Sequence, residues 1–100
     1  MAKGYWVLRI DIKNPEQYAA YRAANGDAFR KYGARFLVRG GVFENPLGES
    51  RPINTVIEFP SFEAAKACFA SPEYKRALEI RGDAIDGDLV IVEGYDGAQL

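Results

Sequence analysis

Two charged residues, Arg39 and Glu58, stand in segments that otherwise carry the apolar and β-branched side chains of buried strands. A loop centred near Gly48-Glu49 would place them opposite each other, on the same side of an antiparallel pair. A bulge at Gly40-Gly41 would shift this register by one residue. Such a pair suits catalysis, in which the arginine binds an anionic or enolate substrate and the carboxylate transfers a proton. The alternative is a structural ion pair that neutralises two buried charges.

Further candidate substrate contacts lie on the inner faces of the expected helices and on the first strand. Asn25 and Arg81 can close one pocket from above; the alternatives are a backbone hydrogen bond for Asn25 and interaction with the helix macrodipole for Arg81. Tyr21 and Tyr74 can present hydroxyl groups to the same pocket, although tyrosine on an apolar helical face more often packs in the core. Trp6 suits a pocket wall and a packing role equally well.

The composition excludes several classes of active site. The 100 residues include no histidine, which excludes Ser-His-Asp and Cys-His catalysis and histidine-ligated zinc or haem within this chain. The single cysteine, Cys68, excludes an intrachain disulfide and is expected to be a small buried apolar residue. Asp83, Asp86 and Asp88 lack the spacing of a calcium loop and are expected in a solvated turn. With no glycine-rich phosphate loop either, we expect no metal and no cofactor.

The charge balance limits the partners that we expect. Thirteen basic and 14 acidic residues give a formal net charge of −1, so no basic field attracts nucleic acid. No apolar run approaches the roughly 18 residues that span a membrane, and the N-terminus lacks a signal peptide. A lone cysteine fits a reducing compartment. The expected location is therefore the cytoplasm, with neither nucleic acid nor membrane as a partner.

Hydrophobic periodicity, caps and turn residues predict the order of the elements. The expected strands cover residues 5–12, 35–39 with a continuation over 42–44, 54–59 and 89–93. One helix runs from the cap at Asn14 to Gly33, and a second begins after Ser61, breaks at Ser71 and ends at Gly82. The order β-α-β-β-α-β over residues 1–100 predicts a single α+β domain of the ferredoxin-like class, with a four-stranded antiparallel sheet and both helices on one face.

The first and last expected strands are apolar on both sides. Trp6, Leu8 and Ile10 alternate with Tyr5 and Val7, and the last strand follows the same pattern. One helical layer covers only one side of a sheet, and the other side would leave a large apolar patch in water. A second copy of the chain that packs sheet against sheet removes this patch, so we predict a symmetric homodimer.

Several short motifs resemble the domain-of-unknown-function 1330 family. They are Asn14-Pro15-Glu16, the Tyr18/Tyr21 pair, residues 36–41, residues 58–65, Ser71-Pro72-Glu73-Tyr74 and residues 90–95. The resemblance covers nearly the whole chain and implies a ferredoxin-like protomer that pairs into a dimeric α+β barrel. It implies no settled activity. Superfamily relatives include cofactor-free monooxygenases, small-ring isomerases, haem-degrading enzymes and non-catalytic stress proteins.

Two interpretations of the function remain open at this point. The first is a homodimeric α+β barrel protein with a small-molecule pocket; the alternative is a cofactor-independent enzyme, monooxygenase- or isomerase-like, that acts on a small oxygenated or aromatic metabolite. The RNA-recognition motif shares this element order, but the nearly neutral segment 54–59, which carries an acid, does not suit RNA.

Overall fold

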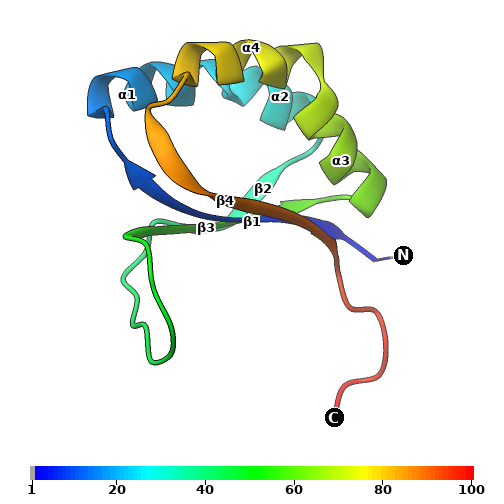
Figure 1. Ribbon diagram of the computed structural model, residues 1–100. Helices are drawn as coiled ribbons and strands as arrows, with labels where there is room; N and C mark the ends of the chain where they lie inside the picture. The colour runs from blue at the N-terminus through cyan, green and yellow to red at the C-terminus, as the bar shows by residue number, and fades with distance from the viewer. Residues whose placement is uncertain (1) are drawn as a thin grey trace.

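Four strands form one antiparallel sheet in the computed structural model, which describes residues 2–100 (Figure 1). They are β1 (Gly4–Ile12), β2 (Arg35–Arg39), β3 (Ile53–Phe59) and β4 (Ile85–Glu93), in the spatial order β2-β3-β1-β4. β1 lies inside the sheet because it pairs with both β3 and β4 along most of its length. The predicted ferredoxin-like arrangement is confirmed.

All four helices cover the same face of the sheet (Figure 1). They are α1 (Pro15–Ala24), α2 (Gly26–Lys31), α3 (Phe62–Ala70) and α4 (Pro72–Arg81). The side chains of Asn14, Ser61 and Ser71 cap α1, α3 and α4, each accepting a backbone N–H from three residues further on. The predicted break at Ser71 is confirmed.

The prediction of one continuous first helix is wrong, because the helix divides at Asn25. Asn25 keeps right-handed angles (φ −73°, ψ −16°) as the C-cap of α1 and the N-cap of α2. Asparagine followed by Gly26 is a weak helix-forming pair, which explains why the regular hydrogen bonding is interrupted at this point.

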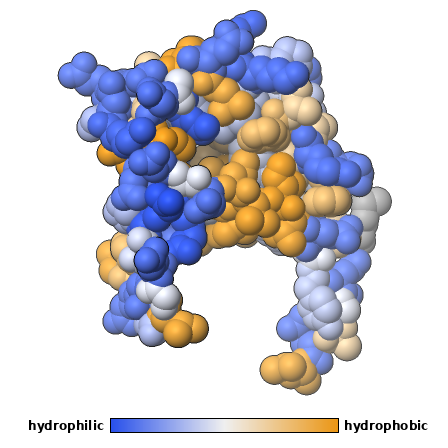
Figure 2. Space-filling view, in the orientation of Figure 1, coloured by the Kyte–Doolittle hydropathy of each residue, from blue (hydrophilic) through white to orange (hydrophobic). Residues whose placement is uncertain are grey.

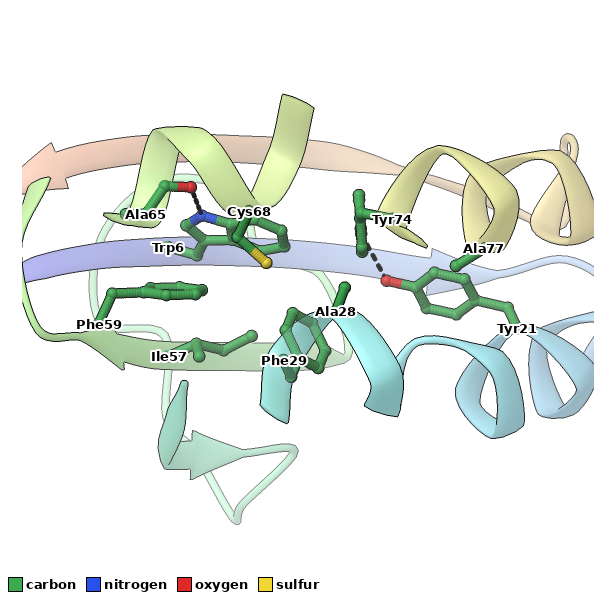
Figure 3. Close-up of a cluster of buried hydrophobic side chains, with 10 residues drawn as sticks. All are labelled: Trp6, Tyr21, Ala28, Phe29, Ile57, Phe59, Ala65, Cys68, Tyr74 and Ala77. Carbon is green, nitrogen blue, oxygen red and sulfur yellow. Dashed lines mark hydrogen bonds between the residues drawn. The ribbon is translucent and has the colours of Figure 1, made fainter. Parts of the chain in front are cut away.

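Aromatic side chains form the centre of the core, between the helices and the sheet (Figure 3). Trp6 is fully buried, and its indole N–H donates to the carbonyl oxygen of Ala65 at 2.8 Å. Four rings have centroids 5.0–5.8 Å from the Trp6 ring, and they belong to Phe29, Phe59, Phe69 and Tyr74. The alternation of β1 therefore points Trp6 into the helical layer.

A buried hydrogen bond joins α1 to α4. The hydroxyl oxygens of Tyr21 and Tyr74 lie 2.6 Å apart (Figure 3). Burial, and then the neighbouring Tyr21, raise the pKa of the Tyr74 phenol well above its usual range. The Tyr74 hydroxyl therefore remains neutral, and the two hydroxyl groups satisfy each other inside the helical layer.

The register of β2 against β3 differs from the prediction. Glu58 pairs with Arg35, and Arg39 pairs with Thr55. The irregularity lies at Leu37, between Phe36 and Val38, instead of at Gly40-Gly41. The chain leaves the sheet at Gly40 (φ +64°), so residues 42–44 do not continue the strand and 40–52 form one loop. The loop is therefore centred nearer Pro46-Leu47 than Gly48-Glu49.

β4 begins earlier than predicted. It pairs with β1 from Ile85 opposite Ile12, so Asp86 and Asp88 belong to the strand and not to a turn. Both acids are exposed. Asp86 forms an ion pair with Lys13, and Asp88 forms one with Arg51, each with an N···O distance of 3.6 Å. The pairing with β1 thus continues through residues whose composition resembles a turn.

The face of the sheet away from the helices carries a row of valines, one from each strand. Val7 pairs with Val56 and with Val90, and Val56 pairs with Val38, so all four side chains point to this face. Val7, Val38 and Val90 are 36%, 42% and 56% exposed. The loop 40–52 and the C-terminal segment 94–100 extend on this side (Figure 1), and apolar atoms gather between these segments and the helical layer (Figure 2).

The hydroxyl pair predicts a measurable coupling energy. Tyr21→Phe leaves the Tyr74 hydroxyl without its partner and should lower the free energy of unfolding by about 1–3 kcal/mol. Tyr21→Phe with Tyr74→Phe should cost less than the two single changes together, because both polar groups are then absent. Urea unfolding measures this, with exposed Tyr95→Phe as the control. Strict additivity would contradict the coupling.

Candidate functional site

A cleft of about 460 Å³ lies between α1 and the helix-facing side of the sheet. Its floor is apolar and includes Leu8 and Ile10 of β1 and Ile57 of β3. Tyr18 and Tyr21 of α1 form part of the opposite wall. This volume and this apolar lining are typical of small-molecule pockets, which measure roughly 300–1,000 Å³.

A few polar side chains enter the cleft from different elements. Arg22 comes from α1, Asn25 from the junction between α1 and α2, Arg39 from the end of β2 and Thr55 from β3. Asn25 is 6% exposed, and its amide makes no hydrogen bond within residues 2–100. The amide is not one of the polar atoms that are fully enclosed without a partner, so its remaining exposure leaves it open to a ligand in the cleft.

Positive charge surrounds the half-buried Tyr18. Burial, and then the neighbouring Tyr21, raise the pKa of the Tyr18 phenol, whereas the charges of Arg22, Arg39 and Arg81 oppose this rise. The guanidinium groups of the cleft are therefore close enough to act on a group bound beside this ring.

A bulge determines the direction of Arg39. In a regular strand, Phe36 and Arg39 would point to opposite faces, because side chains alternate. The irregularity at Leu37 brings both to the helix-facing side, where the Arg39 guanidinium carbon lies 4.1 Å from the centroid of the Phe36 ring. Without the bulge, Arg39 would share the open face with Glu58.

A second cavity of about 280 Å³ lies beside the first, between α4 and β4, and also contacts Leu8 and Ile10. Tyr74 and Arg81 line it. The Arg81 guanidinium carbon lies 5.2 Å from the centroid of the Tyr21 ring, and its Nε is buried without a hydrogen-bond partner in the described residues. The two cavities therefore share a floor on β1.

The structure brings five of the predicted site residues to these cavities. Tyr21, Asn25 and Arg39 line the larger one, and Tyr74 and Arg81 line the smaller one. The predicted pocket that Asn25 and Arg81 close together is thus divided into two adjacent spaces.

Two predicted site residues lie elsewhere, and the predicted Arg39–Glu58 pair is wrong. Glu58 points to the open face, where it accepts a hydrogen bond from the Tyr5 hydroxyl at 3.3 Å. The slipped register and the bulge separate it from Arg39. Trp6 is enclosed in the core and lines neither cavity, so its environment is that of a packing residue.

Three cleft residues with polar groups, Tyr18, Arg22 and Thr55, are absent from the predicted site. Tyr18 and Arg22 lie four residues apart, and Asn25 follows three residues after Arg22. This spacing places them on one helical face and is the signal that identifies Arg22.

The expected packing role of Cys68 is confirmed. The side chain is fully buried, and burial followed by the charge of Glu73 raises the pKa of the thiol to about 12. Within residues 2–100, no three Cys, Asp or Glu side chains cluster closely enough to hold a metal ion. No helix in this part of the chain is long and apolar enough to cross a membrane.

Known proteins share this fold at low sequence identity. The profile of the Domain of unknown function (DUF1330) matches residues 3–95, which confirms the predicted resemblance. The protein of unknown function RPA0582 from Rhodopseudomonas palustris is 21% identical (TM-score 0.76), and the match covers 96% of this chain and 85% of that one. SnoaB, a cofactor-independent oxygenase from Streptomyces nogalater, is 12% identical (TM-score 0.65), with 100% and 97% covered. Among curated proteins, none matches this sequence.

The unpartnered amide predicts that stability rises when it is removed. Asn25→Leu should increase the free energy of unfolding by about 1 kcal/mol, because an apolar side chain replaces a largely buried residue whose amide has no hydrogen-bond partner in residues 2–100. Thermal unfolding should shift upward by roughly 4–8 °C. Asn14→Leu is the control: its amide caps α1, and its loss should lower stability by about 1 kcal/mol. A decrease for both variants would indicate a structural role for Asn25.

Proposed function

Because this chain belongs to the DUF1330 family, whose description assigns no activity, we propose its function from the geometry: a homodimer that binds a small organic molecule in the cleft between α1 and the sheet. The observation that carries this proposal is Asn25, a residue only 6% exposed at the wall of an apolar cleft, whose amide has no hydrogen-bond partner in residues 2–100 and is not sealed from the cleft. Ligand sites combine such an apolar lining with a few placed polar groups.

The position of Glu58 favours ligand binding over catalysis as the function of the cleft. The proton-transfer hypothesis needs Arg39 and Glu58 at one substrate, but within one subunit they lie on opposite faces of the sheet. The likeness to the oxygenase SnoaB, at 12% identity, concerns the fold alone. Among the residues that the structure describes, none that lines the cleft carries a carboxylate that could act as a base.

The valine row on the open face is an argument for the proposed homodimer. A two-fold axis places the same surface on itself, so a continuous apolar row is complementary to its own copy. Next to the row, the open face pairs Arg35 with Glu58, so it has no excess charge of one sign there to repel a copy. The loop 40–52 and the segment 94–100 extend on the same side, where they can enclose the partner (Figure 1).

The location proposed for this dimer is the cytoplasm. The single thiol of Cys68 is free and buried, which suits a compartment where cysteines stay reduced.

The cleft can be tested by filling it. The neutral probe 2-naphthol should bind the protein and shift the NMR signals of residues beside the cleft. Ala19→Phe places a ring in the cleft and should weaken this binding by about tenfold or more, equivalent to about 1.4 kcal/mol. Ala20→Phe is the matched control, because Ala20 is exposed on the same helix and does not line the cleft. Equal binding by both variants would exclude this cleft as the site.

The dimer can be tested at the β4 end of the valine row. Val90→Lys places a charge in the proposed interface and should raise the dimer dissociation constant by at least about tenfold. Ile80→Lys, a change on the helical layer, should leave it unchanged. Light scattering should give twice the 11.1 kDa subunit mass for the wild type. A single-subunit mass at high concentration would contradict the dimer without affecting the cleft.

A further inference from the structure

The charge inside the larger cleft is entirely positive. Among residues 2–100, the charged side chains that line it are the exposed Arg22 and Arg39, and no aspartate or glutamate of this part of the chain lines it. This differs from the chain as a whole, in which 13 basic and 14 acidic residues nearly cancel. The cleft therefore favours a ligand with a negative charge.

Neither arginine is neutralised by the protein. Within residues 2–100, Arg22 and Arg39 form no ion pair and no side-chain hydrogen bond. By contrast, Arg30 binds Asp27 at 2.8 Å and Arg51 binds Asp11 at 2.9 Å. The arginines of the cleft thus keep their hydrogen-bond donors available.

The Phe36 ring holds the Arg39 side chain. Stacking over the ring at 4.1 Å restrains the guanidinium plane without using its N–H groups. A planar guanidinium with free N–H groups matches the two oxygens of a carboxylate and can bind both of them.

The rest of the cleft suits an apolar body. Leu8, Ile10 and Ile57 form the floor, and the half-buried Tyr18 ring faces them from α1. The buried Asn25 amide adds one hydrogen-bonding group that a polar substituent of the ligand can satisfy.

We propose that the ligand of this cleft is an organic carboxylate with a ring-sized apolar body. Its acid binds Arg39 and Arg22, its body lies on the β1 and β3 floor, and Asn25 contacts a polar substituent. This inference rests on the proposed function, since it names the chemical class of the molecule bound in the same cleft.

Two probes of equal shape test the charge requirement. Calorimetry with the full chain at pH 7 compares 2-naphthoate with the neutral 2-naphthamide. Naphthoate should bind at least about tenfold more tightly at low salt, a difference of about 1.4 kcal/mol. The preference should shrink as salt screens the charges, since the Debye length falls to about 3 Å at 1 M.

Charge-removing variants then assign the preference to residues. Arg39→Gln and Arg22→Gln should each reduce the preference for naphthoate about tenfold and leave naphthamide binding within about twofold. Arg76→Gln is the matched control, since Arg76 is exposed on α4, lines neither cavity and loses the same charge. The two cleft variants are independent, so a folding defect in one leaves the other informative.

The outcomes separate this inference from the proposed function. Equal binding of naphthoate and naphthamide, or equal effects of Arg39→Gln and Arg76→Gln, would overturn the carboxylate and leave the cleft as a binding site. Absence of binding by 2-naphthol, naphthamide and naphthoate alike would overturn the cleft and the carboxylate together.

Discussion

The burial of Trp6 is the constraint on which the arrangement of the whole sheet depends. Its indole fills the space between α3 and the sheet and donates to the Ala65 carbonyl, so β1 has only one possible orientation. Because side chains alternate along a strand, the same orientation places Leu8 and Ile10 beneath both cavities and Val7 on the open face. Because paired residues point to the same face of a sheet, the orientation of β1 also determines which side chains of β3 and β4 face the helices.

The polar part of the cleft comes from elements around this apolar floor. α1 and its junction with α2 supply Arg22 and Asn25, and the edge strand β2 supplies Arg39. The core is thus satisfied internally, through the Trp6–Ala65 and Tyr21–Tyr74 hydrogen bonds, while the cleft retains groups that are not. The side chains of Arg22, Asn25 and Arg39 make no hydrogen bonds within residues 2–100, so they can form new hydrogen bonds when a ligand binds.

The sequence predicts the fold better than the site, for a physical reason. The caps at Asn14, Ser61 and Ser71 and the alternation of β1 are local signals, and the sequence predicts them correctly. Strand composition predicts all four strands but misplaces the end of β2 and the start of β4. The pairing of Arg39 is not local: it depends on where the chain leaves β2 and on a bulge at Leu37, a residue with no turn propensity. An error of one residue in either position exchanges the two faces of the strand.

The bulge in β2 makes chain length in this short segment as consequential as residue type. β2 is an edge strand with a single neighbour, so an added or lost residue can be accommodated there without disturbing β1. Phe36 and Val38 pair with the adjacent residues Ile57 and Val56, so deleting Leu37 would leave a regular strand in which Arg39 still faces the cleft. A strand of unchanged length without the bulge would instead turn Arg39 to the open face. Relatives that keep the arginine but pair this segment regularly over the same length would retain the fold and lose the Arg39 charge from the cleft.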